Sequence, residues 1–254
     1  MKKNIILVGG TGYGKSSTIN ALCNAPVAAV AAFEEPETKE IQKYETDNMV
    51  LWDTPGIGSS VEEDSKNLEA LKNILREKDE AGNPFIDQVV LVMDAGSRDM
   101  GTSFELLNDV IVPSLSDSRK DSILVALNRC DAVKPRNWNY EANEPDEVLK
   151  QFLEEKAESV RARIAESIGI EVEVVYYCAG ETEDDEQSPA YNVDKLFAKL
   201  ADVTTNKCEV TVNKPQCKES ATTENKNNVT VESNITVQKK ESFVKRIVRK
   251  LFGR

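Results

Sequence analysis

The sequence predicts an α/β fold in which a mostly parallel sheet lies between two layers of helices. Within residues 1–202, apolar segments of strand length alternate with segments whose apolar residues recur at helical spacing. Such alternation is typical of a doubly wound parallel sheet. The polar and glycine-rich motifs each follow an expected strand directly, and ligands bind at this end of the strands in sheets of this kind.

The first half of the pattern begins with a buried strand and the helix that follows it. Asn4-Ile5-Ile6-Leu7-Val8 is apolar and rich in β-branched residues. A hairpin comes next, with the polar triplet Thr46-Asp47-Asn48 as its turn. A segment with helical spacing then ends before the helix-breaking cluster Ala81-Gly82-Asn83-Pro84. The elements expected here are strands at 4–8, 40–45 and 49–52 and helices at 17–22 and 61–78.

The second half continues with strands that are apolar along nearly their whole length, as expected for strands covered on both faces. The longest helix has Pro145 near its first turn and Gly169 just past its end. The acidic run 181–186 fits no calcium-loop spacing, so we expect a solvated loop there. The expected elements are strands at 88–93, 122–127 and 171–177 and helices at 103–112, 145–167 and 191–200.

The composition excludes several classes of function. The chain of 254 residues has a formal net charge of −12 and contains no histidine. Because the chain is acidic, we do not expect it to bind DNA. Because it contains no histidine, proton transfer by histidine and metal ligation by histidine are excluded. Five scattered cysteines fit a reducing compartment. The apolar run after Met1-Lys2-Lys3 is too short for a signal peptide, and we find no apolar stretch of bilayer length, so we expect a cytoplasmic protein.

The composition also divides the chain into three parts. Residues 1–202 carry the strand and helix pattern of a globular domain. Residues 203–240 are rich in Thr, Asn, Lys, Glu and Ser and lack aromatic residues, which predicts a flexible polar linker. Residues 241–254 place apolar side chains on one helical stripe and Lys or Arg on the other, which predicts a basic amphipathic helix.

A phosphate-binding loop is the clearest motif in the chain. Residues 9–16 read Gly-Gly-Thr-Gly-Tyr-Gly-Lys-Ser, which matches G-x-x-x-x-G-K-S between an expected strand and an expected helix. The glycines let backbone N–H groups point at phosphate oxygens, and the helix adds its positive end. Lys15 is expected to reach the β- and γ-phosphates, and the Ser16 hydroxyl to ligate Mg²⁺. The fold class is therefore a three-layer P-loop NTPase fold.

Three further motifs follow strands in the order of a guanine-nucleotide site. Asp53-Thr54-Pro55-Gly56 is D-x-x-G, which places Asp53 in the Mg²⁺ shell and the Gly56 N–H at the γ-phosphate. Asn128-Arg129-Cys130-Asp131 is close to N-K-x-D, whose Asp accepts two hydrogen bonds from guanine. Cys178-Ala179-Gly180 offers a backbone N–H to the guanine oxygen. The last two motifs are weak singly, but four motifs in this order indicate a guanine-nucleotide site.

On these motifs the chain resembles the Era-like bacterial GTPases of the translation-factor (TRAFAC) class, and especially the small prophage-associated GTPases. The resemblance covers about residues 1–202. It implies a six-stranded G domain that binds GTP with Mg²⁺ and hydrolyses it to GDP. It also implies that Thr38 is the switch threonine that meets Mg²⁺ and the γ-phosphate. Thr46 competes for this role, but it falls in the expected hairpin turn, where Thr is favourable turn chemistry.

Together the motifs and the resemblance assign roles to individual residues. The residues expected to act in catalysis are Lys15, Thr38 and Gly56, and the expected metal ligands are Ser16, Thr38 and Asp53. The residues expected to contact the nucleotide are Gly9, Gly10, Thr11, Gly12, Tyr13, Gly14, Lys15, Ser16, Ser17, Asp53, Gly56, Asn128, Arg129, Asp131, Cys178 and Ala179.

Three residues depart from the pattern of the family. Arg129 stands where Lys is usual, although its stem and planar head can still stack on the base. Cys178 replaces the usual Ser, which matters little where backbone contacts dominate. Ile57 stands where other switches place a water-orienting glutamine, and isoleucine cannot orient water. We therefore predict slow intrinsic turnover.

The basic tail leaves three binding partners open. Residues 243–254 carry five basic side chains and an apolar stripe, and each basic side chain near an anionic surface contributes about 1 kcal/mol. The partner is an anionic membrane surface, the acidic body of the chain itself, or the groove of a protein or RNA. The length of the linker favours a remote partner.

The leading interpretation is a cytoplasmic GTPase switch attached peripherally to the inner face of the membrane. One alternative is a nucleotide-gated binding module with little turnover, and another is a GTPase of ribosome or RNA assembly. A homodimer or an effector protein is a further expected partner, for which the sequence holds no readable motif.

Overall fold

The computed structural model describes residues 2–24, 27–28, 40–58, 60–98, 100–180, 182–183, 186–187 and 189–202. All of these lie in the first of two compact units, which spans residues 1–220. Thr38, the polar linker and the basic tail lie outside the described residues. Among the described residues, no helix is both long and apolar enough to cross a membrane.

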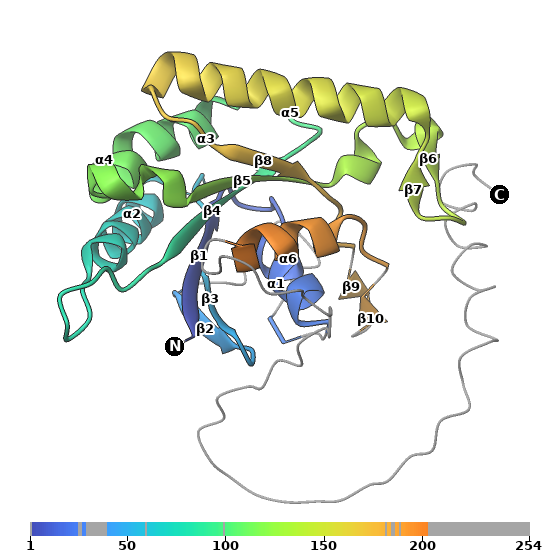
Figure 1. Ribbon diagram of the computed structural model, residues 1–254. Coiled ribbons are helices and arrows are strands. Elements are labelled where there is room, and N and C mark those ends of the chain that lie inside the picture. The colour runs from blue at the N-terminus through green and yellow to red at the C-terminus, as the bar shows by residue number, and fades with distance from the viewer. Residues whose placement is uncertain are drawn as a thin grey trace, which may run out of the picture. The chain divides into compact units, whose positions relative to one another are not determined.

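A six-stranded sheet forms the centre of the described unit, in the order β2-β3-β1-β4-β5-β8 (Figure 1). All neighbouring strands run parallel except β2, which pairs antiparallel with β3. The mostly parallel, six-stranded sheet is therefore confirmed. Its strands are β1 (Lys3–Gly9), β2 (Gln42–Glu45), β3 (Met49–Asp53), β4 (Gln88–Asp94), β5 (Ile123–Asn128) and β8 (Glu173–Tyr176).

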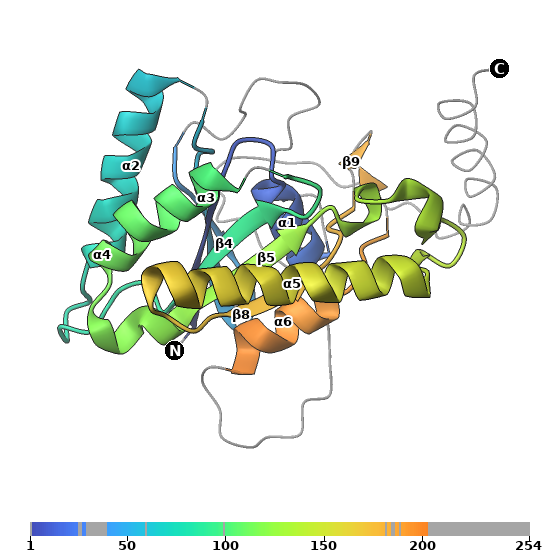
Figure 2. The same ribbon diagram turned by 90° about the horizontal axis from the view of Figure 1, so that it is seen from above.

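Helices cover both faces of this sheet, as expected (Figures 1 and 2). On one face lie α2 (Val61–Arg76), α3 (Gly101–Glu105), α4 (Val112–Ser114) and α5 (Glu147–Ile168). On the other face lie α1 (Lys15–Cys23) and α6 (Val193–Asp202). A separate apolar core fills the space between the sheet and each helical layer.

The two cores explain why the central strands are apolar along most of their length. Successive side chains of a strand point to opposite faces of the sheet. In β1, Ile6 and Val8 therefore join the core under α5, while Ile5 and Leu7 join the core under α1. All four side chains are fully buried. With both faces covered, these four positions of the strand leave no place for a polar side chain.

The structure corrects the sequence-based expectations at two places. The helix expected at 103–112 runs from Gly101 to Ser114 and contains a π-helical turn, Leu106–Ile111. Pro145 is not in the first turn of α5: Asp146 caps that helix by accepting a hydrogen bond from the Leu149 N–H. Pro145 instead pairs with Trp138 in a two-stranded ribbon.

Short strands also form within the acidic run after β8. A solvated loop is expected there, and within it the described residues 182–183 and 186–187 pair as two short antiparallel strands. The small elements are β6 (Trp138–Asn139), β7 (Glu144–Pro145), β9 (Thr182–Glu183), β10 (Glu186–Gln187) and 3₁₀ turns at Asp117–Ser122, Cys130–Ala132 and Pro135–Asn137.

Candidate functional site

The phosphate-binding loop leaves β1 at Gly9 and enters α1 at Lys15, so it lies at the carboxyl end of a central strand. The ammonium of Lys15 lies inside the loop, with Nζ 3.2 Å from the Gly9 carbonyl oxygen and 3.1 Å from that of Gly10. Burial lowers the pKa of Lys15 to about 8, against the opposing charge of the Asp53 carboxylate. A desolvated cation held mainly by neutral carbonyls has much to gain from pairing with a phosphate anion.

Gly14 closes the loop at a point where only glycine fits. Its φ is 84°, in the left-handed region, and a Cβ there would lie 2.3 Å from Nδ2 of Asn128. Its carbonyl oxygen accepts from both the N–H and the hydroxyl of Thr18, at 2.9 and 2.6 Å. Because that hydroxyl has a single proton, the Tyr177 hydroxyl is the donor in the 2.6 Å contact between the two side chains. Thr18 therefore holds the loop at Gly14, and Tyr177, directly after β8, holds Thr18.

Two of the three expected metal ligands lie together beside the loop. Ser16 Oγ donates to Asp53 Oδ2 at 2.6 Å, which brings the first residue pair of the expected Mg²⁺ shell into direct contact. Asp53 is buried at the end of β3. A hydroxyl and a carboxylate are the oxygen donors that Mg²⁺ prefers, so these residues fit the metal. The third expected ligand, Thr38, lies outside the described residues.

The segment after Asp53 packs directly on the phosphate-binding loop. The Thr11 N–H donates to the Ile57 carbonyl at 3.0 Å, and the Ile57 N–H donates to the Gly9 carbonyl at 3.3 Å. This approach requires glycine at position 56, since a Cβ there would lie 2.5 Å from Cα of Thr11. The Ile57 side chain packs against the apolar core, so it supplies no polar group to the site.

Asn128 joins the phosphate side of the site to the base side. It is buried at the end of β5, where its Nδ2 donates to the Tyr13 carbonyl at 3.0 Å. Its Oδ1 accepts from the Ala179 N–H, also at 3.0 Å. One amide side chain therefore ties the phosphate-binding loop to the loop after β8.

Asp131 and Cys178 meet on the base side. The Asp131 Oδ1 atom is buried and has no hydrogen-bond partner among the described residues. A buried acceptor of this kind is costly unless a ligand donates to it. Burial, and then the negative charge of Asp131, raise the pKa of the Cys178 thiol. The backbone N–H groups of Cys178 and Ala179 donate to the Tyr191 carbonyl and to Asn128 respectively.

Arg129 has a partner of its own beside the site. Its Nη1 lies 3.4 Å from Oδ2 of Asp94, at the end of the neighbouring strand β4. The backbone of Arg129 is left-handed, with φ of 59°, and its side chain is 53% exposed. The ion pair therefore directs the guanidinium toward the carboxyl end of β4, with about half of the side chain exposed.

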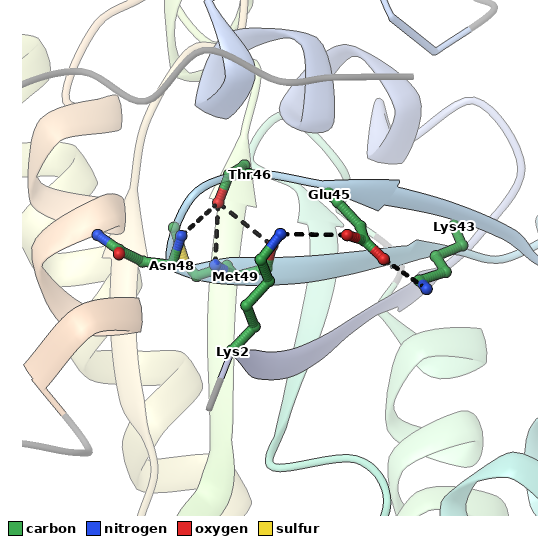
Figure 3. Close-up of polar contacts among 6 residues, drawn as sticks. All are labelled: Lys2, Lys43, Glu45, Thr46, Asn48 and Met49. Atoms are coloured by element: carbon green, nitrogen blue, oxygen red, sulfur yellow. Dashed lines mark hydrogen bonds and ion pairs between the residues drawn. The ribbon is translucent and has the colours of Figure 1, made fainter. Parts of the chain in front are cut away.

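Thr46 proves to be a turn residue. Its hydroxyl accepts from the backbone N–H groups of Asn48 and Met49 and donates to the Met49 carbonyl, which closes the β2–β3 hairpin (Figure 3). Figure 3 also shows Glu45 between Lys2 and Lys43, with which it forms ion pairs at the exposed edge of the sheet. With its hydroxyl committed to the turn, Thr46 no longer competes with Thr38 for the switch position.

The four motifs are therefore brought to one end of the sheet, as their positions after strands predict. Sequence reasoning missed three residues that support them: Thr18, Tyr177 and Asp94. Thr18 lies one turn into α1, where a hydroxyl facing back to the loop is a recognisable pattern. Tyr177 and Asp94 directly follow or end strands on the ligand side, and this position is the only property of the sequence that could have indicated them.

The fold is that of a P-loop NTPase, and this set of loops is similar to that of the G domains of Era-like GTPases. Residues 4–129 match the family model of the 50S ribosome-binding GTPases. A protein of Gluconobacter oxydans described as probable GTP-binding protein EngB is 30% identical over 142 residues, which are 53% of this chain and 56% of that protein. The match thus spans little more than half the length of this curated relative.

Solved structures share the fold at lower identity. Era of Aquifex aeolicus bound to GDP and aluminium fluoride has a TM-score of 0.55 and 18% identity, covering 84% of this chain and 60% of that one. Toc33 of Arabidopsis thaliana has a TM-score of 0.56 and 20% identity, covering 81% of this chain and 85% of that one. These similarities establish the common architecture of the G domain.

Proposed function

We propose that this protein is a Mg²⁺-dependent molecular switch that binds GTP and hydrolyses it to GDP and phosphate. The observation that carries the proposal is the Asn128 bridge between the phosphate loop and the base-side loop, beside the buried unpartnered oxygen of Asp131. Guanine presents two adjacent N–H donors that a carboxylate can accept, and adenine does not. Asp131 is therefore the proposed discriminator between the two purines.

Nucleotide competition tests the base preference. GTP, GDP and ATP compete for a labelled guanine nucleotide on the wild type and on Asp131→Asn, with Mg²⁺ present. We expect guanine preference in the wild type and its loss in the variant. Asp131→Asn replaces an acceptor by a donor, so it should gain affinity for xanthosine nucleotides, which carry a carbonyl in place of the guanine amino group. That gain distinguishes a changed preference from misfolding, and indifference of the wild type to the base contradicts the proposal.

The proposed chemistry relies on positioning and electrostatics. In this proposal Lys15 stabilises negative charge on the β- and γ-phosphates, and the Gly56 N–H donates to the γ-phosphate. Ser16 and Asp53, with Thr38 as the third ligand, would hold Mg²⁺, which neutralises charge on the phosphate oxygens when bound. The nucleotide is expected over the loop residues 9–17 and against Asn128, Arg129, Asp131, Cys178 and Ala179.

We further propose that intrinsic hydrolysis is slow. Ile57 follows the Gly56 that packs on the loop, and its side chain lies with the apolar core, so it does not orient a water molecule. An activating group supplied by a partner accelerates related reactions by about 10³–10⁵-fold. Single-turnover phosphate release should be slow for the protein alone, and a rate equal to that of a partner-activated GTPase would refute this prediction.

The position of the Ile57 side chain against the apolar core also favours a second candidate, a nucleotide-gated binding module with little turnover. Phosphate release at saturating GTP separates the two, measured alone, with lipid vesicles and at rising protein concentration. Acceleration with protein concentration would support a homodimer, and dimerization is described as important for the GTPase activity of the chloroplast translocon components atToc33 and psToc159. No acceleration under any condition favours the binding module. A ribosomal partner is supported only by the description of the matching family, and the acidic composition of the chain counts against it.

Attachment to an anionic membrane through residues 243–254 completes the proposal. It is supported by the five basic side chains and the apolar stripe of that segment. The test is co-sedimentation with vesicles, with and without anionic lipid, of the full chain and of a chain ending at residue 238. Pelleting that requires both the tail and anionic lipid supports attachment, and equal pelleting of both chains rejects it.

A further inference from the structure

A pocket of about 580 Å³ lies between α3 and α5, outside the nucleotide site. Its walls are residues 95–98 and Met100 after β4, Phe104, the pair Val133 and Lys134, and one face of α5. The volume falls within the range of about 300–1,000 Å³ that is usual for ligand pockets. None of its lining residues belongs to the phosphate-binding loop or to the other three nucleotide motifs.

The charge of the described residues that line this pocket is opposite to that of the chain as a whole. Four of its lining residues are basic, and none of the described lining residues is acidic, although acidic residues outnumber basic ones by 44 to 32 in the chain. Two acidic residues of α5 have partners outside the pocket: Glu155 accepts from Gln151, and Glu158 pairs with Arg161. The basic residues of the pocket are Arg98, Lys134, Lys156 and Arg163.

Two of these cations lie over aromatic rings. Lys134 Nζ is 4.1 Å from the centre of the Phe152 ring, and the Arg163 guanidinium carbon is 4.5 Å from that of Phe104. Within the described part of the chain, neither cation forms an ion pair with a carboxylate. Cation–π contacts place a charge beside a flat apolar surface without neutralising it. The pocket therefore offers ring faces and positive charge together.

The third cation is held in place from the opposite wall. Lys156 Nζ donates to the Ser97 carbonyl oxygen at 2.9 Å, which ties α5 to the loop after β4. Burial lowers the pKa of Lys156, while the Asp94 carboxylate nearby acts in the opposite direction. Asp94 itself pairs with Arg129, so its charge is shared between two cations. A partly desolvated ammonium with a single carbonyl partner can accept an anionic ligand at low cost.

We propose that this pocket binds an anion carried on a flat apolar body, such as a carboxylate, phosphate or sulfonate attached to an aromatic ring. The ring would stack between the Phe104 and Phe152 sides, and the anion would pair with Lys156 and Arg163. The same chemistry is offered by a free aromatic anion and by an acidic peptide that contains a phenylalanine. The inference does not depend on the proposed GTP hydrolysis, because the pocket shares no residue with that site.

Fluorescence of anilinonaphthalene sulfonate, a free aromatic anion, tests this binding on the full chain. The titration is done with saturating GDP and Mg²⁺, so that the nucleotide site is filled, and repeated without nucleotide. The pocket variant is Lys156→Gln with Arg163→Gln. The matched control is Lys150→Gln with Arg161→Gln, which removes one Lys and one Arg from the same helix outside the pocket. Urea denaturation of both variants verifies that each is folded.

We expect saturable binding by the wild type and the control, and binding that is about tenfold or more weaker in the pocket variant, because two charge-assisted contacts are lost. Displacement of the dye by phenyl phosphate indicates a small-molecule ligand. Displacement by the peptide acetyl-Glu-Asp-Phe-Asp-Glu-amide, without displacement by phenyl phosphate, indicates an acidic protein segment. Absence of saturable binding in the wild type, or equal affinities of the folded pocket variant and the control, overturns the inference.

Discussion

Replacing Lys15 with methionine removes an ammonium that is buried in the phosphate-binding loop while keeping a side chain of similar length. Lys15 is 6% exposed, and its Nζ contacts the carbonyl oxygens of Gly9 and Gly10. Burial lowers the pKa of Lys15 from 10.5 to about 8. Without nucleotide, the buried ammonium of Lys15 therefore lowers the free energy of unfolding by an amount that depends on pH.

The sign and size of that dependence follow from the lowered pKa. Between pH 8 and 10.5 the unfolded chain keeps the Lys15 proton and the folded chain loses it. The free energy of unfolding must then rise with pH in this window. A pKa difference of one corresponds to about 1.4 kcal/mol, so the wild type should gain about 3 kcal/mol across the window relative to a variant without the amine.

Urea denaturation of nucleotide-free wild type and Lys15→Met, at intervals from pH 7 to pH 10.5, measures this difference. Tyrosine and cysteine titrations occur in both proteins and cancel. Lys150→Met, which removes a lysine on the outer face of α5 that is 46% exposed, is the control and should follow the wild-type profile. If the difference in unfolding free energy between wild type and Lys15→Met is constant from pH 7 to pH 10.5, the ammonium is not desolvated and the reasoning fails.

Three further predictions concern the supports of the loop. Asn128→Asp turns a carboxylate oxygen toward the Tyr13 carbonyl and should cost about 1–3 kcal/mol of unfolding free energy in urea, whereas the exposed Asn139→Asp should change it by less than about 0.5 kcal/mol. Gly56→Ala, with its Cβ 2.5 Å from the Thr11 Cα, should speed hydrogen exchange of the Thr11 N–H, and unchanged exchange would contradict the close packing. Tyr177→Phe should lose about 1 kcal/mol of unfolding free energy and weaken GDP binding by calorimetry, and unaltered affinity would mean that the Gly14 carbonyl is held without it.

The sequence was sufficient to predict the sheet because the central strands contain runs of consecutive apolar residues. Ile5, Ile6, Leu7 and Val8 are all apolar since both faces of β1 are covered, and no helix among the described residues has such an uninterrupted run of fully buried apolar side chains. The motifs of the candidate site were predictable for a related reason. Each is a short local pattern with a glycine or polar residue directly after a strand, and parallel topology brings the strand ends together.

Features that depend on distant residues could not be predicted in this way. The contact between Thr18 and Tyr177 joins positions 159 residues apart, and the ion pair of Arg129 with Asp94 joins two different strand ends. Pro145 was placed wrongly because proline favours both the start of a helix and the edge of a ribbon. The local sequence holds no information on the partner strand at Trp138 that decides between the two.

The arrangement around Asn128 has a consequence for how such a site would act as a switch. Its amide donates to the phosphate side through Tyr13 and accepts from the base side through Ala179, so neither loop can move without changing a buried hydrogen bond of the other. Gly14, which contacts the same amide, is also the residue whose carbonyl is held by Thr18. In the proposed function, phosphate binding and base recognition would therefore be coupled through one side chain. A ligand that engages both sides should stabilise the site more than two separate ligands that each engage one side. We therefore predict that guanosine and pyrophosphate, added together as separate molecules, stabilise the protein less than GDP does.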